Sequence, residues 1–201
     1  MSNLVFRKAD IIEIPITPEM LQFAQENAHK GSMNQYSMLD GERNIEGLLG
    51  ELAVHKYLPM LTYEPTKHHD FTFALKSGTL TIDAKNKFDV KTYVTPNLDW
   101  DCSIFGYEGG KKCHMYIFTS TDKNNTKVWI KGYVMKTLLV APEKFYAAGS
   151  FRRTTQGSVQ YKKDNYVVQV KELNRMDFLK NRLEEITKQQ SQTGSTPQGQ
   201  P

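Results

Sequence analysis

The sequence predicts an α/β fold in which a mixed β-sheet is flanked by helices. Segments that alternate apolar and polar residues, as strands do, occur among segments with apolar residues every three or four positions, as in helices. The chain has 201 residues, which suits one domain with a sizeable core. We therefore expect a single domain over residues 1–189.

The N-terminal part predicts a strand followed by a helix. Residues 4–16 contain four isoleucines and favour a strand. Thr17 can cap the helix that follows, Pro18 suits its first turn and Glu19 favours its positive end. Gly31 can end this helix, and the polar residues 31–43 predict a loop.

A second helix is predicted over residues 44–58. Its apolar residues have the spacing i, i+3, i+4 and i+7, and they are Ile45, Leu48, Leu49 and Leu52. Gly47 and Gly50 are unfavourable here, since each costs about 1 kcal/mol relative to alanine inside a helix. We therefore expect another part of the chain to approach the helix backbone closely at these glycines. Glu51 directly follows Gly50.

Two strands are predicted next, one on each side of a turn. Residues 70–75 and residues 79–92 alternate apolar and polar side chains. The intervening Lys76-Ser77-Gly78 is typical of a turn. Asn86-Lys87 is a weak point that predicts a bend or bulge in the second strand.

The rest of the chain predicts a long loop, further strands and a final helix. The loop covers residues 95–112 and is rich in Pro, Gly and Asp, and loops of this length in compact domains are often functional. The elements expected after it are strands over 113–120 and 127–135, a short helix over 135–146, a strand or hairpin over 158–171, and a helix over 174–189. Residues 190–201 are almost entirely Gln, Ser, Thr, Gly and Pro, which predicts a disordered polar tail.

Composition narrows the class of protein. The 26 basic and 22 acidic residues give a net charge of +4, which permits an acidic partner such as nucleic acid without requiring one. The two cysteines lack the spacing of a zinc site, so we expect reduced thiols in a cytoplasmic protein. No apolar run approaches the roughly 18 residues of a membrane helix, and the N-terminus lacks the apolar core of a secretion signal.

Four charged residues are the candidate chemistry of this chain. Mg²⁺ prefers hard oxygen ligands, and Asp70 and Asp89 can supply carboxylates. The backbone carbonyl of Val90 can supply a third oxygen, and Glu51 can bind the same ion directly or through water. Lys91 lies two residues after Asp89 on a predicted strand, so it projects from the same face. A lysine there can orient an attacking water or stabilise developing negative charge.

A second acid and lysine compete for this role. Asp83 and Lys85 have the same spacing as Asp89 and Lys91, so the residues alone leave both pairs open. We favour the later pair because its apolar neighbours Phe88 and Val90 suit an inward strand face. The alternative for either pair is an exposed ion pair at a strand edge, which contributes little to stability.

The chain resembles the PD-(D/E)XK nuclease superfamily, and in particular its small phage-type members. The segments that carry the resemblance are residues 47–53, 69–71 and 88–92, in the order helix acid, strand acid, acid-x-lysine, together with the later strand-like segment 130–134. His69 stands where the motif has proline.

The resemblance implies a restriction-endonuclease-like core with a four-stranded mixed sheet and bound Mg²⁺ or Mn²⁺. It also implies that Asp70 and Asp89 are metal ligands, that Lys91 is the catalytic lysine and that Glu51 is the helix acid.

Several residues are candidate DNA contacts. Trp100, Phe105 and Tyr107 lie in the predicted long loop, where they can stack on unpaired bases. The alternative is that these aromatics hold the loop against the core. The candidate phosphate contacts are Lys85, Lys87, Lys111, Lys112, Arg152 and Arg153.

The expected function is hydrolysis of DNA phosphodiester bonds by a metal-activated water, as in an endonuclease, with a homodimer as one arrangement. The expected location is the cytoplasm, which would be the host's for a phage-encoded protein. One alternative is a catalytically inactive nuclease-fold module that binds DNA or protein. Another is an unrelated α/β protein in which the motif is coincidental.

Overall fold

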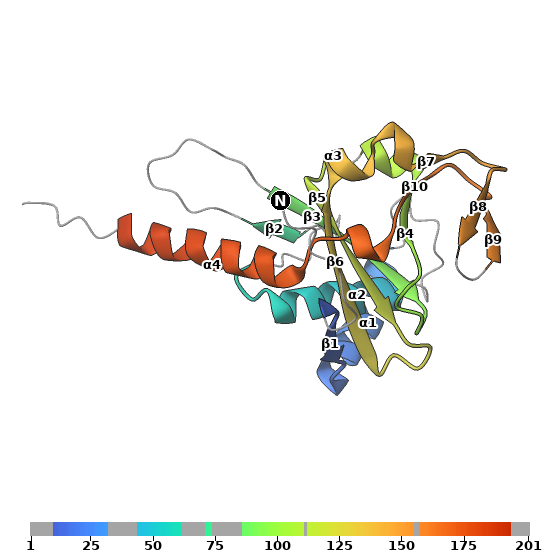
Figure 1. The fold of residues 1–201 in the computed structure, drawn as a ribbon. Helices are drawn as coiled ribbons and strands as arrows, with labels where there is room; N and C mark the ends of the chain where they lie inside the picture. The colour runs from blue at the N-terminus through green and yellow to red at the C-terminus, as the bar shows by residue number, and fades with distance from the viewer. Residues whose placement is uncertain are drawn as a thin grey trace, which may run out of the picture.

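A mixed five-stranded sheet lies at the centre of the protein (Figure 1). The computed structural model describes residues 10–31, 44–61, 71–73, 86–110, 112–154 and 157–193. In spatial order the strands are β1 (Ile12–Pro15), β6 (Lys127–Met135), β5 (Met115–Thr121), β3 (Asn86–Val94) and β2 (Phe71–Phe73). β3 is parallel to β5, and every other neighbouring pair in this sheet is antiparallel. The predicted α/β class with a mixed sheet is confirmed.

Three helices cover one face of this sheet. They are α1 (Pro18–Gly31), α2 (Asn44–Tyr57) and α4 (Met176–Thr193). Buried apolar residues from all three share one core with inward residues of the strands, such as Phe88 and Ile117. None of the described helices is long and apolar enough to cross a membrane.

A second core lies on the opposite sheet face, so β5 is buried along its whole length. It is covered by a three-stranded sheet of β4 (Cys102–Phe105), β10 (Asn165–Val168) and β7 (Phe145–Tyr146). Four short helical turns and a hairpin complete this side of the protein: η3 (Gly106–Gly110), α3 (Lys136–Leu139), η4 (Pro142–Lys144), η5 (Val170–Glu172), and the hairpin of β8 (Phe151–Thr154) and β9 (Gly157–Gln160). Figure 1 shows this hairpin and α4 extending from opposite sides of the molecule.

Gly50 lies where α2 rests on the sheet. A Cβ atom at this position would overlap Oγ1 of Thr92 and lie 2.7 Å from Oγ1 of Thr119. The predicted close approach is therefore confirmed for Gly50. At Gly47 a Cβ atom would meet none of the described residues within 4 Å, so the described part of the chain shows no close approach there.

Local periodicity predicted most of the described elements correctly. The helices over 17–31, 44–58 and 174–189 correspond to α1, α2 and α4, and the strands over 113–120 and 127–135 correspond to β5 and β6. The predicted single strand or hairpin over 158–171 is wrong: β9 in this segment pairs with β8, whereas β10 pairs with β4 and β7. Predictions for residues 1–9, 32–43, 74–85 and 194–201 lie outside the described residues.

Three predictions are corrected where pairing between distant segments decides the structure. Residues 95–112 contain β4 and η3 instead of a plain loop, because β4 pairs with β10 much later in the chain. The predicted helix over 135–146 is limited to α3 and η4, after which β7 also pairs with β10. α4 continues past residue 189 to Thr193, into the predicted tail.

The register of the β2–β3 ladder is continuous through Asn86 and Lys87, so the bulge predicted there is absent from its described part.

Candidate functional site

Asp89 and Lys91 project from the face of β3 that lies opposite the three helices. Phe88 belongs to the core beneath the helices, whereas Tyr93 packs against the second core. Because side chains alternate along a strand, Asp89 and Lys91 share the face of Tyr93. Lys91 Nζ lies 3.3 Å from Asp89 Oδ2, and the side chains are 21% and 14% exposed. The predicted pair is therefore in contact and within reach of solvent.

Glu108 joins this pair, and the sequence interpretation missed it. Its carboxylate is ion-paired with Lys91 Nζ. The backbone N–H of Phe105 donates to Glu108 Oε2 at 2.9 Å, and the Tyr116 hydroxyl donates to the Glu108 carbonyl at 2.7 Å. Glu108 is only 6% exposed, which is unusual for a glutamate unless it is paired. Lys91 is thus held between two carboxylates by groups from β3 and η3.

No short motif marks Glu108 in the sequence, because it lies in a glycine-rich segment that resembles a loop. A glutamate becomes informative here only once β4 is known to fold back onto the sheet.

We expect Glu108→Gln to lower the free energy of unfolding by about 1.5–3 kcal/mol, the range for hydrogen bonds to charged groups. The amide oxygen still accepts from Phe105, but the Lys91 ammonium loses one of its carboxylate partners. Urea denaturation measures the change, and Glu143→Gln, at an exposed position in η4, is the matched control. Equal stability of the two variants would show that the Lys91–Glu108 pair contributes nothing.

Glu51 approaches the sheet from the other side. It lies half-buried on α2, and α2 packs on the face of β3 that carries Phe88 and Thr92. Sheet geometry therefore separates its helix from the face of Asp89 and Lys91. The predicted convergence of Glu51 with that pair stays a prediction.

The Val90 carbonyl points toward the β2 side of β3. Thr119, on β5, donates from its hydroxyl to the Lys91 carbonyl at 3.5 Å, so the Lys91 carbonyl points toward β5. Carbonyl directions alternate along a strand, which turns the Val90 carbonyl the other way. This is the side on which β2 lies.

The other predicted site residues fall into three groups. Asp70, Asp83, Lys85 and Lys111 lie outside the described residues, as does the side chain of Lys87. Lys112 and Arg153 are exposed and accessible to a partner. Arg152 is 11% exposed, is ion-paired with Asp101 and lies 5.5 Å from the Tyr146 ring centroid, so its charge is already used within the protein.

The described residues supply only part of a metal site. Among them, no three His, Cys, Asp or Glu side chains are grouped to hold an ion. The Asp89 carboxylate and the Val90 carbonyl are hard oxygen donors that suit Mg²⁺. A complete site needs further carboxylates, for which the sequence offers Asp70 and Glu51.

Comparison of the chain with protein-family models, curated proteins and solved structures gave no match. The functional interpretation therefore depends on the residues themselves.

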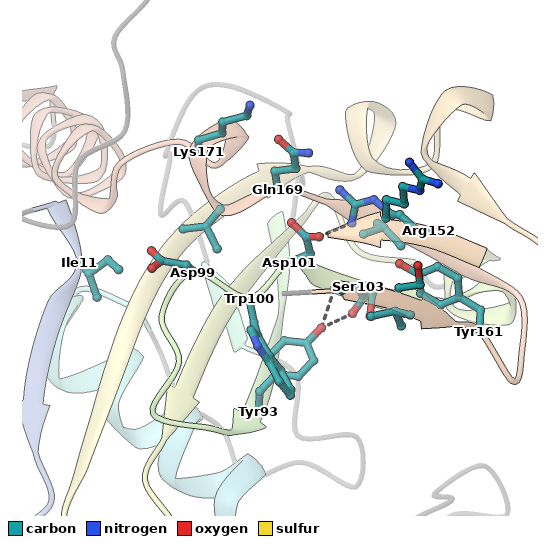
Figure 2. A pocket seen from close by; sticks show the side chains of 16 residues that line it. Ile11, Tyr93, Asp99, Trp100, Asp101, Ser103, Arg152, Tyr161, Gln169 and Lys171 are labelled. Carbon is teal, nitrogen blue, oxygen red and sulfur yellow. Dashed lines mark hydrogen bonds and ion pairs between the residues drawn. The ribbon is translucent and has the colours of Figure 1, made fainter. Parts of the chain in front are cut away.

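A pocket of about 930 Å³ lies on the same side of the sheet as Asp89 and Lys91. Figure 2 shows Trp100 and Tyr93 on one side of it, and Arg152 and Tyr161 on another. Tyr93 is fixed there because its hydroxyl accepts from the Ser103 N–H at 2.7 Å. Burial opposes the charge on Arg152, but the Tyr161 hydroxyl and Asp101 outweigh it and raise the pKa of Arg152.

Lys131 is buried behind this pocket at a β-bulge. Ile130 pairs with Thr119 and Gly132 with Phe118, so Lys131 is the additional residue between them. Gly132 has φ +143°, a conformation that other residues rarely adopt.

The contacts of Lys131 tie it to the pocket wall. Its Nζ donates to the Trp100 carbonyl at 3.4 Å and lies 5.8 Å from the Tyr93 ring centroid. Burial lowers the pKa of Lys131, and the nearby charges of Asp99 and Asp101 act against that decrease.

Proposed function

We propose that this protein is a Mg²⁺- or Mn²⁺-dependent deoxyribonuclease that hydrolyses phosphodiester bonds with a metal-activated water. The observation that carries this is the contact between Asp89 and Lys91 on one face of β3, in a position that is partly open to solvent. An isolated acid-x-lysine motif is weak. Here the buried Glu108 also fixes the lysine, which is more order than an incidental surface ion pair requires.

The roles of these residues follow from their chemistry. The Lys91 ammonium has three donors and can hold the attacking water or the developing negative charge while it keeps its carboxylate contacts. Asp89 can offer an oxygen to the cation from the same face. Glu108 positions the ammonium, since its own carboxylate is anchored by the backbone of Phe105. The metal supplies a water of lowered pKa and neutralises charge on the phosphate.

Chain connectivity supports Asp70 as a second ligand. Phe71 pairs with Phe88 in the β2–β3 ladder, and Asp70 and Asp89 are bonded to these residues at the same end of that ladder. If the ladder continues by one residue, the two aspartates become direct cross-strand partners and can share one ion.

The sheet is compatible with the restriction-endonuclease-like core that the sequence resemblance implies. β3, which carries the acid-x-lysine, runs antiparallel to β2 and parallel to β5. Glu51, on α2, precedes both strands in the chain, as in the resembled motif order. DNA is the proposed substrate on the strength of this arrangement and of the chain's positive net charge.

The decisive experiment is a cleavage panel over linear, circular, branched and single-stranded DNA with Mg²⁺ or Mn²⁺. We expect cleavage of at least one substrate, its complete loss in EDTA, and a loss of at least about 100-fold in Asp89→Asn, since a metal ligand is removed. Glu185→Gln, at an exposed position of α4, is the matched control. Cleavage that continues in EDTA or in Asp89→Asn would contradict the mechanism.

A second candidate is a module of the same fold that binds DNA or protein without turnover. It is favoured by the fact that Lys91 is held by two carboxylates, while no group of three metal-ligand side chains occurs among the described residues. DNA binding that is insensitive to EDTA, with no cleavage under either metal, would identify this function.

A further inference from the structure

We propose that the pocket between residues 99–103 and the β8–β9 hairpin binds an unpaired nucleotide, with its base on Trp100 and its phosphate on nearby cations. This inference rests on the proposed function where it names single-stranded DNA as the form of the substrate. The binding chemistry itself can be tested without cleavage.

Trp100 supplies a stacking surface. Its side chain is 52% exposed and lines the pocket, although burial would be expected for so large an aromatic group. The Trp100 backbone is held by Lys131, so the indole is presented from a fixed position. Tyr93 and Tyr161 add further aromatic surface to the same pocket. Stacking on aromatic side chains is how proteins bind unpaired bases without reading their sequence.

Cations predominate among the charged groups around the pocket. Three cations line it, Arg152, Arg153 and Lys171, and a fourth, Lys131, lies behind Trp100. The lining contains two carboxylates, those of Asp99 and Asp101.

Two of these cations interact with acidic groups of the pocket, and the other two are exposed. Arg152 is ion-paired with Asp101, and the Lys131 ammonium lies within electrostatic range of Asp99 and Asp101. Arg153 and Lys171 are exposed to solvent and suit the phosphates of a bound strand. Pairing with Arg152 thus offsets the charge of Asp101, which would otherwise repel a phosphate.

The size of the pocket favours an unpaired nucleotide over a base inside a duplex. Its volume of about 930 Å³ is near the upper end of the range for sites that enclose small ligands. A base inside a duplex cannot enter such a recess unless it leaves the stack, which costs unpairing energy. A single strand has no such cost, because its bases are already separate.

Position connects the pocket to the candidate active site. Tyr93 lines the pocket and lies two residues after Lys91 on the same strand face. Their Cα atoms are therefore about 7 Å apart. A strand with one base in the pocket would pass its neighbouring phosphodiester close to Asp89 and Lys91.

The first test measures binding in EDTA with a fluorescent single-stranded oligonucleotide, thymidine 5′-monophosphate and a blunt duplex. We expect the oligonucleotide to bind, and Trp100→Ala to weaken it between about fivefold and 150-fold, the loss of one stacked base. Phe178→Ala removes an aromatic of similar exposure, 48%, from α4 and should leave affinity unchanged.

The comparison of ligands identifies the source of the nucleotide. Tighter binding of the oligonucleotide than of the monophosphate indicates a strand, and equal affinities with the same loss in Trp100→Ala indicate a free nucleotide. Duplex binding that is as tight and as sensitive to Trp100→Ala would overturn the inference, as would unchanged binding in that variant.

The second test measures the salt dependence of oligonucleotide binding. Replacing Arg153 and Lys171 by glutamine should lower the slope of log K against log salt by about 0.7 for each phosphate that the protein no longer neutralises. Arg182→Gln with Lys188→Gln removes the same charge from exposed positions of α4 and controls for net charge. Equal slopes in the two double variants would exclude Arg153 and Lys171 as phosphate ligands and contradict the proposal.

The two proposals fail in different ways. If binding in EDTA depends on Trp100 but no metal-dependent cleavage occurs, the nucleotide-binding role of the pocket is supported and the nuclease proposal is contradicted. If cleavage depends on Asp89 but not on Trp100, and binding is also unchanged in Trp100→Ala, the nuclease proposal is supported and the nucleotide-binding role of the pocket is contradicted.

Discussion

Lys91→Met is expected to reduce metal-dependent DNA cleavage by about 10²–10⁴-fold, the usual range for the loss of one positioned catalytic group. Methionine keeps an unbranched chain of similar length but has no ammonium to orient water or stabilise charge. Because Asp89 and Glu108 then lose their shared cation, the free energy of unfolding should also fall. Cleavage rates are therefore compared well below the unfolding temperature of the variant.

Two further variants separate catalysis from structure. Lys188→Met, at an exposed position of α4, controls for the loss of one lysine and should cleave at the wild-type rate. Lys91→Arg keeps the charge, but its planar guanidinium places the donors differently, so we expect folding to recover and cleavage to remain low. Full cleavage by Lys91→Met, with circular dichroism that shows an intact fold, would remove Lys91 from the mechanism.

Local sequence patterns were sufficient to predict the structure of segments whose own residues decide it. Thr17 was predicted to cap α1, and its hydroxyl accepts from the Met20 N–H at 3.3 Å. The apolar spacing in residues 44–58 predicted the burial of Leu48 and Leu49 in α2, because a helix that packs on a sheet needs one continuous apolar stripe. Leu52, predicted for the same face, is only half-buried and does not belong to this core. The same is true of Asp89 and Lys91, whose contact follows from strand periodicity alone.

Residues whose environment depends on distant pairing could not be found in this way. Glu108 is buried because η3 follows β4, and β4 is held in place by β10. Lys131 is buried because a bulge in β6 adds one residue between two ladder pairs. Neither a short motif nor local periodicity indicates such a change, since both residues have ordinary polar positions in the sequence.

The aromatic residues of the predicted long loop are partly exposed. Trp100 and Tyr107 are 52% and 55% exposed, so they do not serve mainly to fix that segment against the core. Phe105 stacks on Tyr107 with ring centroids 5.7 Å apart and is itself 37% exposed. Their predicted contact with unpaired bases stays a prediction.

Gly50→Ala is expected to lower the free energy of unfolding by about 1–3 kcal/mol, as overpacking in a dense interior does. The new methyl group would overlap Oγ1 of Thr92 and press on Oγ1 of Thr119, and the two hydroxyls are hydrogen-bonded to each other at 2.9 Å. Alanine is favoured over glycine in a helix by about 1 kcal/mol, which offsets only part of this cost. Urea or thermal denaturation measures the difference.

Gly47→Ala is the matched control, because it makes the same substitution in the same helix at a position where a Cβ atom would meet no described residue within 4 Å. It should stabilise the protein by up to about 1 kcal/mol. Thr92→Ala, combined with Gly50→Ala, removes the nearest obstructing atom and should restore part of the lost stability. Equal effects of the two glycine substitutions would show that α2 can move away from the sheet without cost.

The same pair of variants also tests Glu51. In Gly50→Ala, α2 must shift relative to β3, and the shift moves Glu51 with it. If Glu51 belongs to the metal site, cleavage by folded Gly50→Ala should fall while that of Gly47→Ala stays at the wild-type level. If cleavage is unchanged in both variants, the site is completed by the strand residues, since the face of β3 opposite α2 carries Asp89 and Lys91.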